Sequence, residues 1–185
     1  MNDKGKLVIV SGLSGAGKGT IIKKYFELYP DESVLSISAT TRLPRPGETE
    51  GESYFFKTKE EFRAMIEEGR FLEYACFVDN FYGTPKDWVL KQLKDGKNVI
   101  LEIEQQGAFQ VKEKLPDAVM VFILPPSDDE LVRRLKERGS ETDEQIRKRL
   151  AQAETEKEKI RFYDHVIINE VVEKSAEMLH TIVRS

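Results

Sequence analysis

The stretch SGLSGAGKGT, near the amino terminus, contains the residues best suited to hold a charged ligand. Gly12, Gly17 and Lys18 fit the phosphate-loop pattern G-x-x-x-x-G-K-[ST]. Gly19 stands where that pattern has its hydroxyl, and Thr20 follows one residue late. Glycines allow successive backbone N–H groups to point at one anion, and the lysine adds a full positive charge. The stretch therefore predicts a site for the phosphates of a nucleotide.

A second candidate anion site lies in the segment TTRLPRPGE, where Arg42 and Arg45 are three residues apart and flanked by prolines. Arginine binds phosphate through two parallel N–H groups, so two stiffly held arginines can converge on one small anion. Tyr54 and Tyr82 offer phenol hydroxyls as further donors. The alternative interpretation is a solvated basic loop with aromatic side chains that belong to the core.

Glu73 is the most informative carboxylate before the middle of the chain. In FLEYACF, strand alternation places Phe71, Glu73, Ala75 and Phe77 on one face. A carboxylate in such a row is either a charge on an edge strand or a ligand group. As a ligand group it suits a partner with paired donors, such as the N1–H and N2–H₂ of guanine, which adenine lacks.

Two further carboxylates, Glu102 and Glu104, lie at the carboxyl end of an apolar run and point to the same side. The carboxyl ends of strands in open parallel sheets are where ligands bind, and Glu102 in that position could orient metal-bound water. The alternative is a pair of solvated charges at the end of a strand.

Four short apolar runs predict strands that are buried on both faces. Helical patterns separate them, and alternating strands and helices indicate a parallel sheet covered on both sides. The runs cover residues 7–10, 99–103, 119–124 and 166–168. The first of them leads into the glycine stretch and then into a helical pattern, which is the context that a phosphate loop requires.

Several helix starts can be predicted from capping patterns. A serine or threonine followed three residues later by Glu or Gln forms a capping box, and Thr84 with Pro85 resembles a cap followed by proline in the first turn. The three boxes are Thr58 with Glu61, Ser127 with Glu130, and Thr142 with Gln145.

These elements divide the chain into three parts. Residues 1–36, 85–125 and 150–185 form the expected core with the phosphate loop, and residues 37–84 form a small antiparallel α+β insertion. Residues 126–149 are rich in arginine and predict a lid. We therefore expect an α/β protein in which a parallel sheet is flanked by helices and carries the insertion and the lid.

Composition limits the classes of function. The chain has 185 residues, of which 39% are hydrophobic and 34% charged, as expected for one well-packed domain. Its net charge of −4 gives no general attraction to nucleic acid or to a membrane. Cys76 is the single cysteine, and two distant histidines suggest no metal cluster. No signal peptide or membrane span is recognisable, so we expect a cytoplasmic protein.

Taken together, the motifs resemble those of the guanylate kinase family over about residues 7–169. They are SGLSGAGKGT, TTRLPRPGE, FLEYACF, NFYGTP, ILEIEQQG, RLKERGSET and VIIN. The resemblance implies a P-loop NTPase-type fold and Mg²⁺-dependent phosphoryl transfer from ATP to GMP, giving ADP and GDP. ATP and GMP would be the partners, without nucleic acid or membrane, and a homodimer is left open.

The resemblance also implies roles for matching residues. ATP would be bound by Gly12, Leu13, Ser14, Gly15, Ala16, Gly17, Lys18, Gly19, Thr20 and Asn169. GMP would be bound by Ser38, Arg42, Arg45, Tyr54, Glu73, Tyr82, Thr84 and Glu104. The charge-neutralising catalytic residues would be Lys18, Arg42, Arg134, Arg138 and Arg149. Mg²⁺ would be held through the ATP phosphates and water, near Thr20 and Glu102.

Two departures from the family pattern stand out, because Leu13 replaces a frequent proline and Glu104 an aspartate. Two other functions stay open at this point. One is a catalytically silent guanylate-kinase-like module that binds phosphorylated peptides. The other is a kinase for a different acceptor, such as AMP, dTMP or a phosphorylated sugar.

Overall fold

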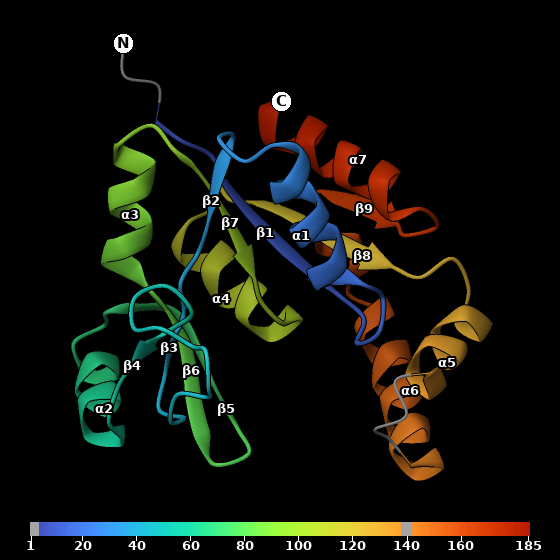
Figure 1. Ribbon diagram of the computed structural model, residues 1–185, viewed down its shortest axis with the longest axis horizontal. Coiled ribbons are helices and arrows are strands. Elements are labelled where there is room, and N and C mark those ends of the chain that lie inside the picture. The colour runs from blue at the N-terminus through green and yellow to red at the C-terminus, as the bar shows by residue number, and fades with distance from the viewer. Residues whose placement is uncertain (1–3, 138–141) are drawn as a thin grey trace.

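A computed structural model describes residues 4–137 and 142–185. Its centre is a five-stranded parallel sheet in the order β2-β7-β1-β8-β9 (Figure 1). The strands are β1 (Leu7–Gly12), β2 (Ser33–Leu35), β7 (Asn98–Glu102), β8 (Val119–Leu124) and β9 (His165–Ile168). All six residues of β1 are buried, as expected for the middle strand of a sheet with helices on both faces.

The four strands predicted from apolar runs are confirmed, and β2 is an additional one. It contains only three residues, of which Ser33 is polar and Leu35 is 40% exposed. Because it lies at the edge of the sheet, it lacks the continuous apolar run that a central strand needs.

Helices cover both faces of the sheet (Figure 1). Helices α1 (Lys18–Leu28) and α7 (Val172–Arg184) pack against each other on one face, and α4 (Gln105–Lys114) lies on the opposite face. Helix α3 (Lys86–Lys94) lies next to β7. Among the described residues, no helix combines the length and the apolar character needed to cross a membrane.

The insertion forms its own four-stranded sheet, in the order β4-β3-β6-β5. Its elements are β3 (Ala39–Thr40), β4 (Phe55–Phe56), α2 (Lys59–Glu67), β5 (Phe71–Phe77) and β6 (Asn80–Pro85). The expected antiparallel arrangement holds for β3–β6 and β5–β6, whereas β3 and β4 pair in parallel. Phe62 of α2 stacks on Phe71 at 4.3 Å between ring centroids and forms a small core separate from the main one.

Two helices, α5 (Asp128–Glu137) and α6 (Asp143–Lys157), occupy the region predicted as a lid. They lead through the short 3-10 turn η1 (Ile160–Phe162) into β9. Figure 1 shows this pair and the insertion on opposite sides of the lower half of the molecule, with the glycine loop between them.

The capping predictions have mixed outcomes. Both Thr58 and Thr142 form complete capping boxes. Ser127 accepts the N–H of Glu130 at 3.1 Å, but the carboxylate of Glu130 binds arginines instead of completing a box. The Thr84 cap was wrong: Pro85 is the N-cap of α3, and Thr84 belongs to β6, where its hydroxyl is used by another side chain.

Candidate functional site

The glycine loop joins β1 to α1, as the sequence predicted. Gly15 and Gly17 have φ values of 94° and 90°, in the region that favours glycine, and Gly17 is the N-cap of α1. The first N–H groups of a helix have no partners within the helix, so they are available to an anion in front of Lys18. The loop therefore provides backbone donors, partial positive charge and one full charge at the same place.

The side chain of Asn169 binds the backbone of the glycine loop. Its buried amide donates to the carbonyl of Ala16 at 2.8 Å and accepts the Ser175 hydroxyl at 3.2 Å. A Cβ atom at Gly17 would lie 2.4 Å from the Asn169 amide nitrogen, so glycine permits this close approach. The structure therefore places Asn169 against the loop backbone, which is a positioning contact.

Arg134 of α5 also reaches the loop. Its guanidinium donates to the carbonyls of Ala16 and Asn169, both at 3.1 Å, and to the Glu130 carboxylate at 2.7 Å. Bonds from Arg133 and Arg134 lower the pKa of Glu130 to about 2. The Glu130 carboxylate thus holds Nε of Arg134, while the two terminal nitrogens of the guanidinium bind the carbonyls of Ala16 and Asn169.

Arg149 of α6 donates to the Ser14 hydroxyl, so the second helix of the pair contacts the same loop. Arg138, the third predicted lid arginine, lies outside the described residues. A hollow of about 330 Å³ opens beside the loop, between α5 and the start of α7. Its lining includes Gly15, Gly17, Thr20, Arg134 and Asn169. Five of the predicted donor-side residues thus line one space.

Lys18 forms an ion pair with Glu104 at 3.3 Å, and its side chain is only 14% exposed. Glu104 is the N-cap of α4 and follows β7, so the carboxyl ends of β1 and β7 bring the pair together. Glu104 is thus the counter-ion of Lys18. The resemblance assigned Glu104 to the acceptor side, whereas the structure pairs its carboxylate with Lys18 of the donor side.

Gly19 explains the displaced hydroxyl of the loop. A Cβ at this position would lie 3.3 Å from one carboxylate oxygen of Glu102, which is tighter than most side-chain contacts. Glycine therefore leaves room for a carboxylate beside the first turn of α1. Although Glu102 as a residue is exposed, partial desolvation raises the pKa of its carboxyl, and the charge of Lys18 acts in the opposite direction.

The predicted acceptor residues of the insertion also converge. The Arg42 guanidinium binds both carboxylate oxygens of Glu48, at 2.8 and 3.0 Å, and lies 5.3 Å from the centre of the Tyr54 ring. The rings of Tyr54 and Tyr82 are 6.3 Å apart. Bonds from Arg42 and from the backbone N–H of Arg45 lower the pKa of Glu48.

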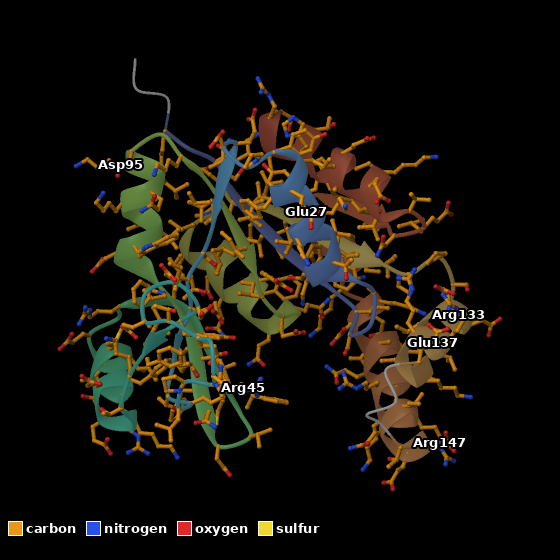
Figure 2. The ribbon with its side chains drawn as sticks, in the orientation of Figure 1. Glu27, Arg45, Asp95, Arg133, Glu137 and Arg147 are labelled. Atoms are coloured by element: carbon orange, nitrogen blue, oxygen red, sulfur yellow. The ribbon has the colours of Figure 1, made fainter. Side chains whose placement is uncertain are left out.

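Residues 43–47 of the TTRLPRPGE segment are exposed. Figure 2 shows Arg45 in the insertion, away from Arg133 and Arg147 on the two lid helices. Ser38 is half-buried, and its carbonyl accepts the N–H of Phe55 at 2.9 Å. Arg45 thus presents a cation to solvent next to the Arg42–Glu48 pair.

Glu73 lies on the edge strand β5 and is nevertheless only 7% exposed. It accepts a hydrogen bond of 2.6 Å from the Thr84 hydroxyl. Burial raises the pKa of its carboxyl, and the Thr84 bonds partly oppose this effect. Because the residue is buried, it is not a solvated edge charge, which was one of the two interpretations of the sequence.

The alternation predicted for Phe71 and Glu73 does not hold. The pairing of β5 with β6 shifts between these residues, so that Phe71 pairs with Pro85 and Glu73 with Thr84. The extra residue, Leu72, enters the main core, while Phe71 packs in the small core of the insertion. The irregularity turns Glu73 toward α4.

Among the residues without an assigned role in the sequence, Glu48 binds Arg42, and three others lie against Glu73 or the strand that carries it. Glu48 lies inside the quoted TTRLPRPGE motif, and its acidic charge among arginines was a signal for the ion pair. The other three lie on one face of α4, at helical spacings that the sequence contains: Gly107, Gln110 and Lys114.

Chemically, this arrangement contains two separate groups of donors that could each hold an anion, and one buried carboxylate. One site combines the loop backbone with Lys18 and two arginines, and the other combines Arg42, Arg45 and two phenols. A molecule with both a phosphate and paired N–H donors would suit the second site together with Glu73.

Comparison with known proteins gives a consistent result. The family model described as guanylate kinase matches residues 4–185. A guanylate kinase of Caldanaerobacter subterraneus is 52% identical over 180 residues, which cover 97% of this chain and 87% of that protein. One of Clostridioides difficile is 52% identical over 182 residues, with 98% and 88% covered. The crystal structure of guanylate kinase from Anaplasma phagocytophilum superposes with a TM-score of 0.75 at 34% identity, covering 98% of this chain and 86% of that chain.

Proposed function

This chain belongs to the guanylate kinase family, and from that premise we propose that it transfers the terminal phosphoryl group of ATP to GMP, giving ADP and GDP. Among this chain's own residues, the observation that carries the choice of acceptor is the buried carboxylate of Glu73. It is paired with the Thr84 hydroxyl, beside a separate cluster of cations and phenols.

The donor side would hold the ATP phosphates through the loop N–H groups and Lys18. In-line phosphoryl transfer requires little covalent help from the protein, so positioning and charge neutralisation dominate. Arg134 and Arg149 already touch the loop, at Ala16 and Ser14, and would stabilise the charge that develops on the transferred group. Lys18 would exchange Glu104 for phosphate when ATP binds.

The acceptor side would hold the GMP phosphate between Arg42, Arg45, Tyr54 and Tyr82. Guanine would present its N1–H and N2–H₂ to Glu73. The nucleophile is a phosphate oxygen that is already anionic, so we propose no general base. Ser38 and Thr84 would lie beside the base, and Glu104 would lie between the two nucleotides.

Mg²⁺ fits the residues at the loop. Among the described residues there is no group of three or more acidic, His or Cys side chains that could enclose a metal ion. Mg²⁺ normally keeps several waters and binds through one or two carboxylates together with substrate phosphates, and the exposed Thr20 and Glu102 supply hard oxygen atoms of that kind. We propose that they hold it through water, where it would neutralise phosphate charge.

Two other functions make different predictions. A silent module that binds phosphorylated peptides would need neither Lys18 nor arginines on the loop, and a kinase for AMP or dTMP would have no use for a buried carboxylate that accepts paired donors. Lys18, the arginines on the loop and the buried carboxylate of Glu73 are all present, and they favour GMP phosphorylation.

The deciding experiment is a steady-state assay of ADP formation with ATP and Mg²⁺ and a panel of acceptors. We expect turnover with GMP and little with AMP or dTMP. ADP formation that does not depend on any acceptor, or a preference for AMP or dTMP, would contradict the proposal.

A further inference from the structure

Strand β5 lies at the edge of its sheet, and a helix covers the first part of that edge. Strand β5 has a partner, β6, on one side only, and α4 lies beside its first residues on the other side (Figure 1). The Gln110 side chain accepts the N–H of Tyr74 at 3.2 Å and donates to the carbonyl of the same residue at 3.3 Å. One amide side chain therefore replaces the two backbone bonds that a neighbouring strand would make.

Lys114, one turn further along α4, binds the irregular part of the strand. Its ammonium donates to the carbonyls of Phe71 and Leu72, at 3.0 and 2.8 Å. In a regular strand, successive carbonyls point to opposite sides, so one donor could not reach both. Their shared donor lies at the register shift next to Leu72, and a cation bound to both carbonyls stabilises that irregularity.

Gly107, one turn earlier on α4, leaves the space that the Glu73 carboxylate occupies. A Cβ atom at Gly107 would lie 2.7 Å from one carboxylate oxygen of Glu73 and 3.2 Å from its carboxyl carbon. Three residues of one helix face thus contact the backbone before Glu73, the backbone after it and the carboxylate itself.

We propose that this face of α4 positions Glu73 for recognition of the acceptor base, with Gln110 and Lys114 as positioning residues and Gly107 as the residue that makes room for the carboxylate. The inference rests on the proposed function, because Glu73 must read guanine for its position to matter. It assigns acceptor specificity in part to the core helix, and not to the insertion alone.

The test compares GMP with IMP, which lacks the 2-amino group of guanine. We expect Gln110→Met and Lys114→Met each to lower the ratio of kcat/KM for GMP to that for IMP by about three- to tenfold, as expected for the loss of one or two hydrogen bonds. The loss should appear mainly in KM for GMP, and KM for ATP should stay unchanged. Gly107→Ala should lower the same ratio by displacing Glu73.

Two controls separate positioning from general loss of stability. Glu113→Met changes an exposed residue of the same helix and should leave the ratio unchanged. Lys114→Arg keeps donors at the two carbonyls and should retain most of the discrimination that Lys114→Met loses. Thermal unfolding of each variant shows whether it is folded under the assay conditions.

Glu73→Gln distinguishes failure of the inference from failure of the proposed function. If Glu73→Gln lowers the GMP-to-IMP ratio but Gln110→Met and Lys114→Met do not, the role of α4 is wrong and that of Glu73 stands. If Glu73→Gln also leaves the ratio unchanged, Glu73 does not read the base, and the inference fails with it. A parallel loss with GMP and IMP in the α4 variants would indicate a structural role and would overturn the proposal.

Discussion

The donor half and the acceptor half of the candidate site are built in different ways. In the donor half, a continuous stretch of ten residues, 11–20, supplies backbone donors and Lys18, and side chains from elsewhere bind to it. In the acceptor half, side chains from separate strands and loops converge, and two of the charged groups have a partner within the protein. Arg42 has Glu48, and Glu73 has Thr84.

This difference follows from what each half must recognise. Phosphate is a compact anion that backbone N–H groups can hold, so a local motif is sufficient. A base must be distinguished by its pattern of donors and acceptors, which requires side chains fixed by tertiary contacts. The acceptor half is therefore more sensitive to changes in distant residues, whereas the donor half depends mainly on its own loop.

The largest effect is expected at Lys18. Because Lys18 belongs to the donor half only, its loss should lower turnover without weakening binding of the acceptor. Lys18→Met should lower kcat by about 10²- to 10³-fold, the effect of removing one preorganised donor to transition-state charge. Affinity for GMP should change little. Steady-state kinetics and calorimetric titration with GMP measure the two quantities, and Lys23→Met, an exposed lysine of the same helix, is the matched control. A Lys18→Met enzyme with near-normal turnover would contradict the assigned role.

The next effect concerns the phosphate clamp of the acceptor half. Arg42→Met and Arg45→Met should each weaken GMP binding by about 10- to 100-fold, because a charge-assisted hydrogen bond contributes about 1.5–3 kcal/mol. KM for ATP should stay within the error of the wild type. If the Arg45→Met variant retained its affinity for GMP, Arg45 would not belong to the phosphate clamp. The clamp would then consist of Arg42 and the two tyrosines.

Replacing Glu73 should lower activity with GMP but raise the stability of the protein at neutral pH. Burial raises its pKa above the ordinary 4.5, so the folded protein binds this proton more tightly than the unfolded chain does. The resulting stability is complete below about pH 4.5 and is lost as the pH rises through the higher folded pKa. At pH 7 the buried charge is therefore a cost that glutamine removes.

We accordingly expect Glu73→Gln to raise Tm at pH 7, because glutamine carries no charge that burial destabilises. The difference from the wild type should shrink as the pH is lowered toward 4.5. Calorimetric unfolding across this pH range measures it. A variant that is less stable than the wild type at pH 7 would show that the Thr84 bond outweighs desolvation.

The smallest effects should come from the two complete capping boxes, one in the acceptor half and one in the donor half. Thr58 caps α2 in the insertion and Thr142 caps α6, the helix that carries Arg149. Each Thr→Ala change should cost about 1 kcal/mol of helix stability. We expect Thr58→Ala to raise KM for GMP a few-fold and to leave KM for ATP unchanged. Thr142→Ala should raise KM for ATP a few-fold and leave KM for GMP unchanged. If either variant changed both KM values equally, the two halves would not be separate.

The donor half could be predicted from sequence because its residues are contiguous and its context is local. The strand, the loop and the helix were each recognisable, and so were four of the five central strands. Strand β2 was missed because an edge strand of three residues has no apolar run. Thr84 was misplaced by local capping logic because its hydroxyl bonds to Glu73, a partner that only the pairing of β5 with β6 reveals.

Candidate residues for the acceptor half came from the sequence and the resemblance, but their arrangement could not be predicted. Strict alternation put Phe71 and Glu73 on one face, and the extra residue Leu72 breaks that pattern. The contacts of Gln110 and Lys114 with β5 depend on how a core helix meets the insertion, which no local spacing specifies. The pairing of Lys18 with Glu104 likewise depends on the neighbouring positions of β1 and β7.

The most direct test of two separable halves is a pair of calorimetric titrations, GMP into Lys18→Met and a non-hydrolysable ATP analogue into Glu73→Gln. Sites without shared partners should be independent to within about 0.5 kcal/mol, so each Kd should stay within about twofold of the wild type. Glu104, which pairs with Lys18 and was assigned to the acceptor, is the residue through which the two halves could be coupled. A tenfold weakening of GMP binding by Lys18→Met, or of the analogue by Glu73→Gln, would contradict the account.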